Sequence, residues 1–317
     1  MVTGTWKRRL RPRGAAPAAA AGTDGEDGGP GVAFVLGGGG VLGAHEVGML
    51  RALVEAGIQP DLVVGTSVGA INGAFFAASP GATAVTRLTR LWEGAGASDV
   101  FGGSIFGRIG RLAKSRTHLH DGEPLRRLLV DLLEVELIED LSVPFQCVAA
   151  SIERAAGHWF TSGPIVPAVM ASAAVPGLLP PVEIGGEHFM DGGIVDSIPV
   201  GRAVALGART VYVLQVGRIE RPLSAPTTAW EVGLVAFEIA RRHRFSEAMA
   251  SLPADVAVHV LPTGTPAAAE ETRYNDLAKQ LRYRDFSKVQ EMIDRSFEAS
   301  AAYLRAVAAA EPRRVSP

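Results

Sequence analysis

Short apolar runs alternate with longer amphipathic segments along most of this chain. Residues 32–36, VAFVL, are apolar throughout, and residues 62–64 form a second short run. A segment with apolar residues at helical spacing follows the first run, as Val47, Leu50 and Val54 illustrate. This strand–loop–helix order predicts parallel strands whose two faces are covered by helices, and therefore an α/β fold.

The pattern is mostly helical from residue 83 to residue 133, with a glycine-rich break, and strand signals return in residues 144–151. The segment LLPPVEIGGEHFMDGG predicts two strands joined as a hairpin at a glycine turn. A strand at residues 209–217, a helical region, a strand near residues 256–261 and a C-terminal helix complete the pattern.

Composition divides the chain into three parts. Residues 1–31 are basic, then rich in alanine and proline, then acidic and glycine-rich, which predicts a disordered tail. A weak electrostatic contact between this tail and anionic lipid is the alternative. Residues 32–217 form the predicted main domain, which carries the chemistry described below. We expect residues 218–317 to form a mostly helical extension packed on the same domain.

The overall composition excludes several classes of protein. The 317 residues are 47% hydrophobic, enough for a sizeable core, and the formal net charge of −2 argues against a nucleic-acid-binding protein. A single cysteine, Cys147, fits a reducing compartment, so we expect a cytoplasmic protein. No apolar run of ~18 residues predicts a transmembrane helix, and the tail lacks the apolar stretch of a secretory signal.

The glycine run after the first strand has two chemical interpretations. Gly38, Gly40 and Gly43 match G-x-G-x-x-G, the fingerprint of a dinucleotide fold. That fold also needs an acidic residue at the end of the second strand, but Asp61 lies at the beginning of this strand. A Gly-Lys-Ser/Thr sequence is missing as well, so the nucleotide interpretation is disfavoured.

The second strand instead leads into GTSVG, which has the G-x-S-x-G pattern of a nucleophile elbow. Ser67 would stand on a tight turn between strand and helix, with Gly65 and Thr66 before it and Val68 and Gly69 after it. The pattern alone is weak because the chain is rich in glycine. Its position between an apolar strand and a helix supports Ser67 as a nucleophile.

Loops at the carboxyl ends of neighbouring parallel strands share one edge of a sheet, so the glycine loop is predicted to face Ser67. Amides at a helix N-terminus favour negative charge, and those of Gly39 and Gly40 would be free to point at a substrate oxygen. We therefore predict an oxyanion hole in this loop, formed by Gly38, Gly39, Gly40 and Gly43.

A serine nucleophile needs a base, and none of the seven histidines lies where a catalytic triad would place one. His45, on the first predicted helix, is a minor candidate. The better candidate is Asp191, which ends a short strand and is followed by Gly192 and Gly193. Taken alone, this Asp-Gly pair indicates an ordinary hairpin turn. Together with the elbow and the glycine loop, it favours Asp191 as the base.

These three motifs, GGGVLG, GTSVG and DGG, resemble those of the patatin-like phospholipase family in their order. The segment ASAAVPGLLPPVEI, at residues 171–184, resembles the family's approach to its aspartate, and the likeness covers about residues 32–205. The resemblance implies a three-layer α/β sandwich with a mainly parallel sheet and helices on both faces. It also implies a Ser67–Asp191 dyad that hydrolyses lipid acyl esters through an acyl-enzyme, without metal or cofactor.

Two alternatives to lipid hydrolysis stay open. The same dyad would serve a short-chain carboxylesterase or thioesterase, and a catalytically silent lipid-binding or regulatory module would have the same fold. One departure from the family concerns the head group: Leu42 stands where the family often has Lys or Arg before the last glycine of the loop. Any contribution of that cation to loop orientation or head-group preference is lost.

Two segments rich in basic residues raise the question of membrane contact. Residues 98–116 place four basic side chains among apolar residues at helical spacing, which favours a helix packed on the sheet with a solvated basic face. A mobile lid or a peripheral contact with a membrane is the alternative. A second cluster, Arg241, Arg242 and Arg244, is predicted to be a solvated helix face or a partner surface.

Overall fold

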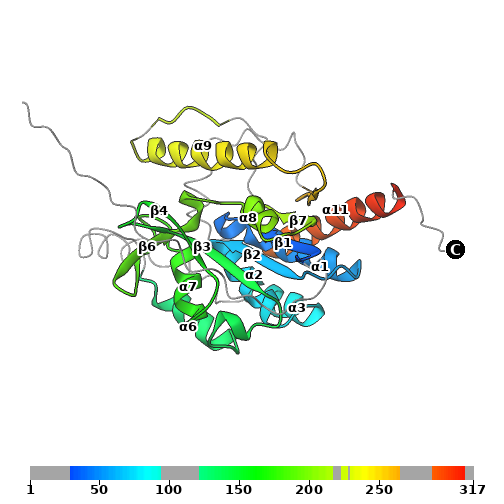
Figure 1. Ribbon diagram of the computed structural model, residues 1–317, viewed down its shortest axis with the longest axis horizontal. Coiled ribbons are helices and arrows are strands. Elements are labelled where there is room, and N and C mark those ends of the chain that lie inside the picture. The colour runs from blue at the N-terminus through cyan, green and yellow to red at the C-terminus, as the bar shows by residue number, and fades with distance from the viewer. Residues whose placement is uncertain (1–28, 94–120, 217–222, 228, 265–287, 311–317) are drawn as a thin grey trace, which may run out of the picture.

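A computed structural model describes residues 29–93, 121–216, 223–227, 229–264 and 288–310. An eight-stranded sheet lies at its centre (Figure 1). The strands are β1 (Val32–Leu36), β2 (Leu62–Thr66), β3 (Phe145–Ser151), β4 (Ala156–Phe160), β5 (Val182–Ile184), β6 (Glu187–Asp191), β7 (Thr210–Leu214) and β8 (Ala257–Val260).

The strand order is β5-β6-β3-β2-β1-β7-β8, and β4 also pairs with β3. Every pairing from β3 through β2, β1 and β7 to β8 is parallel. The three pairings that involve β4, β5 and β6 are antiparallel. The predicted α/β fold with a mainly parallel sheet is therefore confirmed, with an antiparallel region at one end.

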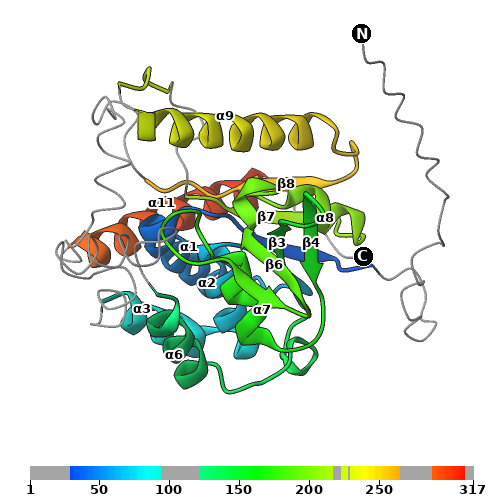
Figure 2. The ribbon, with the colours of Figure 1, turned by 90° about the vertical axis from the view of Figure 1, so that its left-hand side faces the viewer.

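Helices cover both faces of the sheet, as the three-layer prediction requires (Figures 1 and 2). The helices are α1 (Ala44–Glu55), α2 (Val68–Ala78), α3 (Ala82–Glu93), α6 (Glu123–Leu132), α7 (Ile165–Ser172), α8 (Val200–Ala205), α9 (Ala229–Ala250) and α11 (Val289–Ala310). Three short 3₁₀ turns are η1 (Gly40–Gly43), η2 (Ile138–Asp140) and η3 (Gly192–Ile194). Helices α8 and α9 lie on one face, and the other helices lie on the opposite face.

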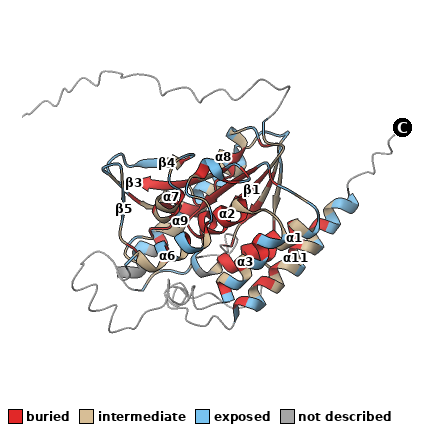
Figure 3. Cartoon of the chain, turned by 90° about the horizontal axis from the view of Figure 1, so that it is seen from below, coloured by how far each residue is buried: buried red, intermediate tan, exposed pale blue. Residues whose placement is uncertain are grey.

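Alternation along the central strands builds two cores. In β1, Phe34 and Leu36 face the larger core beneath α1, α2 and α11, whereas Ala33 and Val35 face the smaller core beneath α8 and α9. Because both faces are covered, the strand is apolar at every position, as parallel sheets generally are. Figure 3 shows the buried residues concentrated in the sheet and in the helix faces turned toward it.

The regions outside the main domain are only partly described. After residue 217, β8 extends the sheet beside β7, α9 lies over the smaller core and α11 packs on α1. The predicted boundaries at residues 31 and 217 stay predictions. The basic segment at residues 98–116 and nearly all of the N-terminal tail lie outside the described residues.

The predicted hairpin forms between β5 and β6. Gly185 and Gly186 connect the strands, with φ angles of 62° and 80°. Positive φ at both central residues is typical of the type I′ turn, whose twist matches that of the strands. The hairpin ends at Asp191, and its turn thereby helps to fix where that carboxylate lies.

Close packing of α1 against α11 depends on Gly48. A β-carbon added there would lie 2.1 Å from the carbonyl oxygen of Ile293 and 2.2 Å from Ser296 Oγ. We predict that Gly48→Ala lowers the free energy of unfolding by about 2 kcal/mol through overpacking, measured by urea denaturation. Gly201→Ala is the matched control, because a β-carbon on this helical glycine meets nothing within 4 Å. Equal stability of the two variants would contradict the packing argument.

Candidate active site

Strand register brings the predicted nucleophile and base to one edge of the sheet. Residue Thr66, which ends β2, pairs with Val148 of β3, and the next β3 residue, Ala149, pairs with Asp191 at the end of β6. Ser67 directly follows Thr66. The glycine loop follows β1, whose Leu36 pairs with Gly65 in β2. The three motifs thus meet at this edge, although Ser67 and Asp191 alone are 124 positions apart in the sequence.

Ser67 has the strained backbone of a nucleophile elbow. Its φ of 57° and ψ of −124° lie where non-glycine residues are rarely found. The two flanking positions, Gly65 and Gly69, need glycine because neighbouring backbone atoms lie too close to leave room for a side chain. A β-carbon at Gly65 would lie 2.5 Å from the carbonyl oxygen of Gly69, and one at Gly69 would lie 2.3 Å from that of Leu36. Helix α2 begins immediately after the serine, at Val68.

Ser67 and Asp191 are directly hydrogen-bonded. The Ser67 hydroxyl donates to Asp191 Oδ2 at 2.6 Å, and the Gly193 amide donates to Asp191 Oδ1 at 2.7 Å. Both side chains are buried. Burial raises the pKa of Asp191 to about 6, although the hydrogen bonds from Ser67 and Gly193 oppose that shift. A carboxylate with a raised pKa is a stronger base than an exposed one, and it lies at the oxygen it would deprotonate.

Contacts distant in sequence hold the elbow in place. The amide of Ser67 donates to Ser172 Oγ at 3.0 Å, and Ser172 ends α7. The hydroxyl of Thr66 donates to the carbonyl oxygen of Asp196 at 2.9 Å. A β-carbon at Gly192 would lie 2.1 Å from the carbonyl oxygen of Val148, so the DGG turn packs tightly against β3. Sequence reasoning missed Ser172, although it lies within the ASAAVPG segment.

Two glycines of the predicted oxyanion hole, Gly38 and Gly43, have structural contacts of their own. The Gly38 amide is engaged, because it donates to the carbonyl oxygen of Ser197 at 2.9 Å. Gly43 closes the turn η1, where amides point back at carbonyl oxygens three residues earlier. A β-carbon at Gly43 would lie 2.4 Å from Val68 Cγ2, so this glycine is required for helix packing. The Gly38 amide is therefore engaged within the protein, and the assignment of the oxyanion hole to these glycines stays a prediction.

Gly39 and Gly40 remain as the loop's amide donors. Neither amide donates to another group within the described ranges. Gly40 has a φ of +58°, which glycine adopts without strain. The amide of Val68, at the first turn of α2, is a third donor at this edge, since the first amides of a helix lack intrahelical partners. The amides of Gly39, Gly40 and Val68 are therefore the candidate donors of an oxyanion hole at this edge.

A buried polar network supports the glycine loop from below. Asn72 donates through Nδ2 to the carbonyl oxygen of Gly43 at 3.0 Å and to Glu46 Oε2 at 2.8 Å, while Trp92 Nε1 donates to Asn72 Oδ1 at 3.0 Å. Burial raises the pKa of Glu46 well above its ordinary value. Sequence reasoning missed this network. The one sign of this network in the sequence is Glu46, a charged residue four positions before the apolar Leu50 and therefore on the same, buried face of α1.

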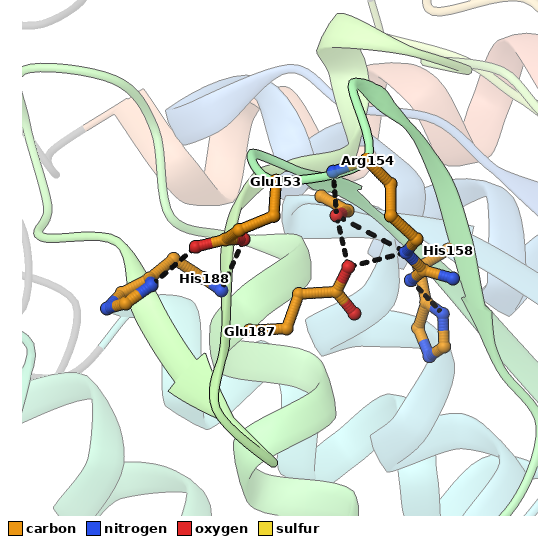
Figure 4. Close-up of polar contacts among 6 residues, drawn as sticks. Glu153, Arg154, His158, Glu187 and His188 are labelled. Carbon is orange, nitrogen blue, oxygen red and sulfur yellow. Dashed lines mark hydrogen bonds and ion pairs between the residues drawn. The ribbon is translucent and has the colours of Figure 1, made fainter. Parts of the chain in front are cut away.

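Exposed ion pairs fix the start of β6 (Figure 4). Glu187 accepts hydrogen bonds from Ser151 Oγ, at 2.6 Å, and from Arg154 Nε, and these contacts lower its pKa. The His188 amide donates to Glu153 Oε2 at 2.9 Å, and this bond lowers the pKa of Glu153. The other carboxylate oxygen, Oε1, lies 2.7 Å from Nδ1 of His188. Glu153 and Arg154, in the turn between β3 and β4, thus bind His188 and Glu187 of β6. His188 therefore belongs to a structural cluster and not to the candidate active site.

Helix α9 passes beside the DGG turn. The ring atom Cζ of Phe237 lies 3.2 Å from the position of a β-carbon at Gly193. One turn later, Arg241 is buried and donates to Glu238 through Nε and Nη2, at 3.1 and 2.9 Å. The prediction of a solvated cluster is therefore wrong for Arg241, because its side chain is buried and forms an ion pair with Glu238. Arg244 is exposed, as predicted.

Two further features bear on chemistry and location. No group of three or more His, Cys, Asp or Glu side chains within the described ranges could hold a metal ion. None of the helices that the structure describes is both long and apolar enough to span a bilayer.

Comparison with known proteins gives a family match. A family model described as patatin-like phospholipase matches residues 34–204. The chain is 35% identical over 193 residues to the patatin-like phospholipase domain-containing protein ZK370.4 of Caenorhabditis elegans, covering 60% of this chain and 14% of that protein. It is 34% identical over 189 residues to lysophospholipase nte1 of Emericella nidulans, covering 60% of this chain and 12% of the relative.

Solved structures also match. VipD from Legionella pneumophila aligns with 84% of this chain and 67% of its own, at 14% identity and a TM-score of 0.36. The type III effector ExoU aligns with 88% of this chain and 53% of its own, at 16% identity and a TM-score of 0.38. The chain spans only 12–14% of the length of the two relatives named above.

The raised pKa of Asp191 predicts a pH-dependent stability change. Since the folded pKa lies above the ordinary value, the group favours folding at low pH, and this advantage is lost as pH rises through about 6. Asp191→Asn carries no charge; its Oδ1 can still accept the Gly193 amide, while its Nδ2 can only donate, to Ser67 Oγ. We expect it to raise the free energy of unfolding by ~1–3 kcal/mol at pH 8 and to have little effect near pH 4.

Chemical denaturation at the two pH values measures this difference. The exposed Asp140→Asn is the control for removing a charge without desolvation. A stability gain for Asp191→Asn that is equal at pH 4 and pH 8 would contradict burial of an ionised carboxylate.

Proposed function

The chain belongs to the patatin-like phospholipase family, and from that premise we propose that it hydrolyses acyl esters of lipids. The proposed activity is of the phospholipase A or lysophospholipase type, with Ser67 as nucleophile and Asp191 as base. One observation carries the proposal: the Ser67 hydroxyl donates to Asp191 Oδ2 at 2.6 Å in a buried site. A dyad in this state is ready for proton transfer.

Acylation begins when Ser67 Oγ attacks the ester carbonyl carbon and its proton passes to Asp191. Negative charge develops on the carbonyl oxygen, where the amides of Gly39, Gly40 and Val68 are the proposed donors. The tetrahedral intermediate then collapses as the bond to the alcohol oxygen breaks. Asp191 returns the proton to that leaving oxygen, and the acyl group stays on Ser67.

Deacylation repeats these steps with water. Asp191 takes a proton from water as the water oxygen attacks the acyl carbon of Ser67. Collapse of the second intermediate breaks the bond to Ser67 Oγ, which recovers its proton from Asp191. The fatty acid leaves and the dyad returns to its starting state. The protein side chains supply every proton transfer, so the proposal requires neither metal nor cofactor.

The proposed site of action is the surface of a lipid aggregate or membrane in the cytoplasm. Helix α9, beside the DGG turn, exposes the apolar side chains of Val232 and Ile239, 54% and 55% accessible. These residues are seven positions apart and therefore lie on one face of the helix. Exposed Arg244 adds positive charge nearby. Such a face supports peripheral contact with anionic lipid.

An activated serine is detected with a fluorophosphonate probe. We predict one adduct per chain by intact mass, located at Ser67 by peptide mapping and absent from Ser67→Ala. Asp191→Asn should slow labelling by about 10²–10⁴-fold, the usual contribution of a general base. The exposed Ser142→Ala is the matched control and should be labelled at the wild-type rate. A folded wild-type protein that stays unlabelled, with or without detergent micelles, would favour the silent lipid-binding module.

The pKa of Asp191 also predicts how activity depends on pH. The base must be ionised, so kcat/KM should fall about tenfold per pH unit below the pKa of about 6 and reach a plateau above it. The pH–rate profile with a 4-nitrophenyl ester measures this. Burial also raises the pKa of Asp196 to about 6, and Asp196→Asn is therefore the control. If the inflection disappears in Asp196→Asn, the titrating group is Asp196, and the role of Asp191 as the base is contradicted.

A further inference from the structure

Ser197 carries a buried hydroxyl group whose hydrogen-bonding capacity is unused. Its side chain is 5% exposed, and within the described part of the chain Ser197 Oγ has no hydrogen-bond partner. Burying a hydroxyl without a partner costs folding free energy, so such groups are uncommon in proteins. None of the steps described above uses this side chain.

Two glycines place the Ser197 hydroxyl beside the dyad. A β-carbon at Gly38 would lie 3.2 Å from Ser197 Oγ and 3.4 Å from Ser67 Cβ. A β-carbon at Gly193 would lie 3.7 Å from Ser197 Oγ and 2.9 Å from Asp191 Oδ1. The position at Gly38 therefore lies between this hydroxyl and the nucleophile, and the position at Gly193 lies between this hydroxyl, the base and the ring of Phe237, whose Cζ is 3.2 Å away.

The backbone of Ser197 is fixed independently of its side chain. Its carbonyl oxygen accepts the Gly38 amide at 2.9 Å, and the preceding Asp196 carbonyl accepts the Thr66 hydroxyl. The segment after the DGG turn is thereby tied both to the glycine loop and to the elbow. Hydrogen bonds therefore hold the backbone that carries this hydroxyl, although none of the described residues bonds to the hydroxyl itself.

We propose that Ser197 Oγ binds the water that hydrolyses the acyl-enzyme, an inference that rests on the proposed function. A buried water needs at least two polar partners. When Ser67 is acylated, it no longer donates to Asp191 Oδ2, so the carboxylate can accept one hydrogen of a water. Ser197 Oγ accepts the other hydrogen and holds the water between the base and the acyl carbon.

Protons and electron pairs balance in this step. The water oxygen forms a bond to the acyl carbon as one of its protons moves to Asp191. The bond between that carbon and Ser67 Oγ then breaks, and Ser67 Oγ takes the proton from Asp191. The second hydrogen stays on the fatty acid's new carboxyl group and dissociates into solvent. Ser197 orients the water and is itself unchanged.

The proposal separates the two half-reactions. Removal of the hydroxyl in Ser197→Ala should impair deacylation, which uses water, and spare acylation, which does not. With 4-nitrophenyl butyrate in stopped flow, we expect the steady-state kcat to fall about tenfold, the effect of losing one hydrogen bond. The burst of nitrophenol should approach one per Ser67, at a rate within about twofold of wild type.

Rapid-quench intact mass gives the complementary readout. The fraction of protein carrying a butyryl group during turnover should rise in Ser197→Ala relative to wild type. Ser197→Thr retains a hydroxyl and should keep the wild-type fraction. Ser300→Ala removes a different buried hydroxyl, which donates to the carbonyl oxygen of Pro262 at 3.1 Å, and should change neither half-reaction. Melting temperatures of all variants report on folding.

Three results would overturn the role of Ser197: equal slowing of both half-reactions in Ser197→Ala, no slowing of either, or accumulation of acyl-enzyme in Ser197→Thr as well. The proposed function fails in a different way. In that case wild-type protein neither releases nitrophenol nor acquires an adduct on Ser67, and the inference about Ser197 falls with it.

Discussion

Burial of the Asp191 carboxylate is the constraint on which the candidate active site depends. The side chain is only 3% exposed, and the two hydrogen bonds that it accepts do not fully replace its lost hydration, so its pKa stays raised to about 6. A carboxylate in water is a poor base for a serine hydroxyl. In the proposed mechanism, desolvation and the 2.6 Å contact with Ser67 let Asp191 act directly on the serine, where other serine hydrolases use a histidine between the two.

The surrounding structure holds several conformations that are unfavourable in isolation. Ser67 adopts a positive φ, which costs of order 1–3 kcal/mol, and the Ser172 hydroxyl fixes its amide from a helix 105 residues away. Glu46 is buried beneath the glycine loop and bonded to Asn72. These costs are offset by a core on each face of the sheet. Strain of this kind is expected where a site is preorganised for chemistry, and stability is the usual cost of function.

The sequence predicted those features that depend on local patterns. Parallel strands, the elbow at Ser67 and the hairpin that ends at Asp191 each have a periodicity or a turn signal in consecutive residues. The direct contact between Ser67 and Asp191 was implied by the resemblance to the patatin-like phospholipase family, and the structure places the two side chains in hydrogen-bond contact. The catalytic roles of these residues stay proposals, although the geometry places them together as expected.

The remaining features depend on contacts between distant segments. No local pattern predicted the contacts of Ser172 or Ser197, since these contacts come from distant segments packed against the two serines. The loop glycines looked alike in sequence, but the Gly38 amide is engaged by Ser197 and Gly43 is needed for packing against Val68. Arg241 was misjudged for the same reason, because its partner Glu238 and its burial arise from how α9 lies on the domain.

The central claim is that lipid esters are cleaved through an acyl group carried on Ser67. It is tested most directly by mixing the protein with a long-chain lysophosphatidylcholine, quenching in acid during turnover and mapping the peptides by mass spectrometry. The account predicts a fatty-acyl adduct on the peptide that contains Ser67, present only while substrate remains and absent from Ser67→Ala. Release of fatty acid with no adduct on Ser67, or with the adduct on another residue, would contradict it.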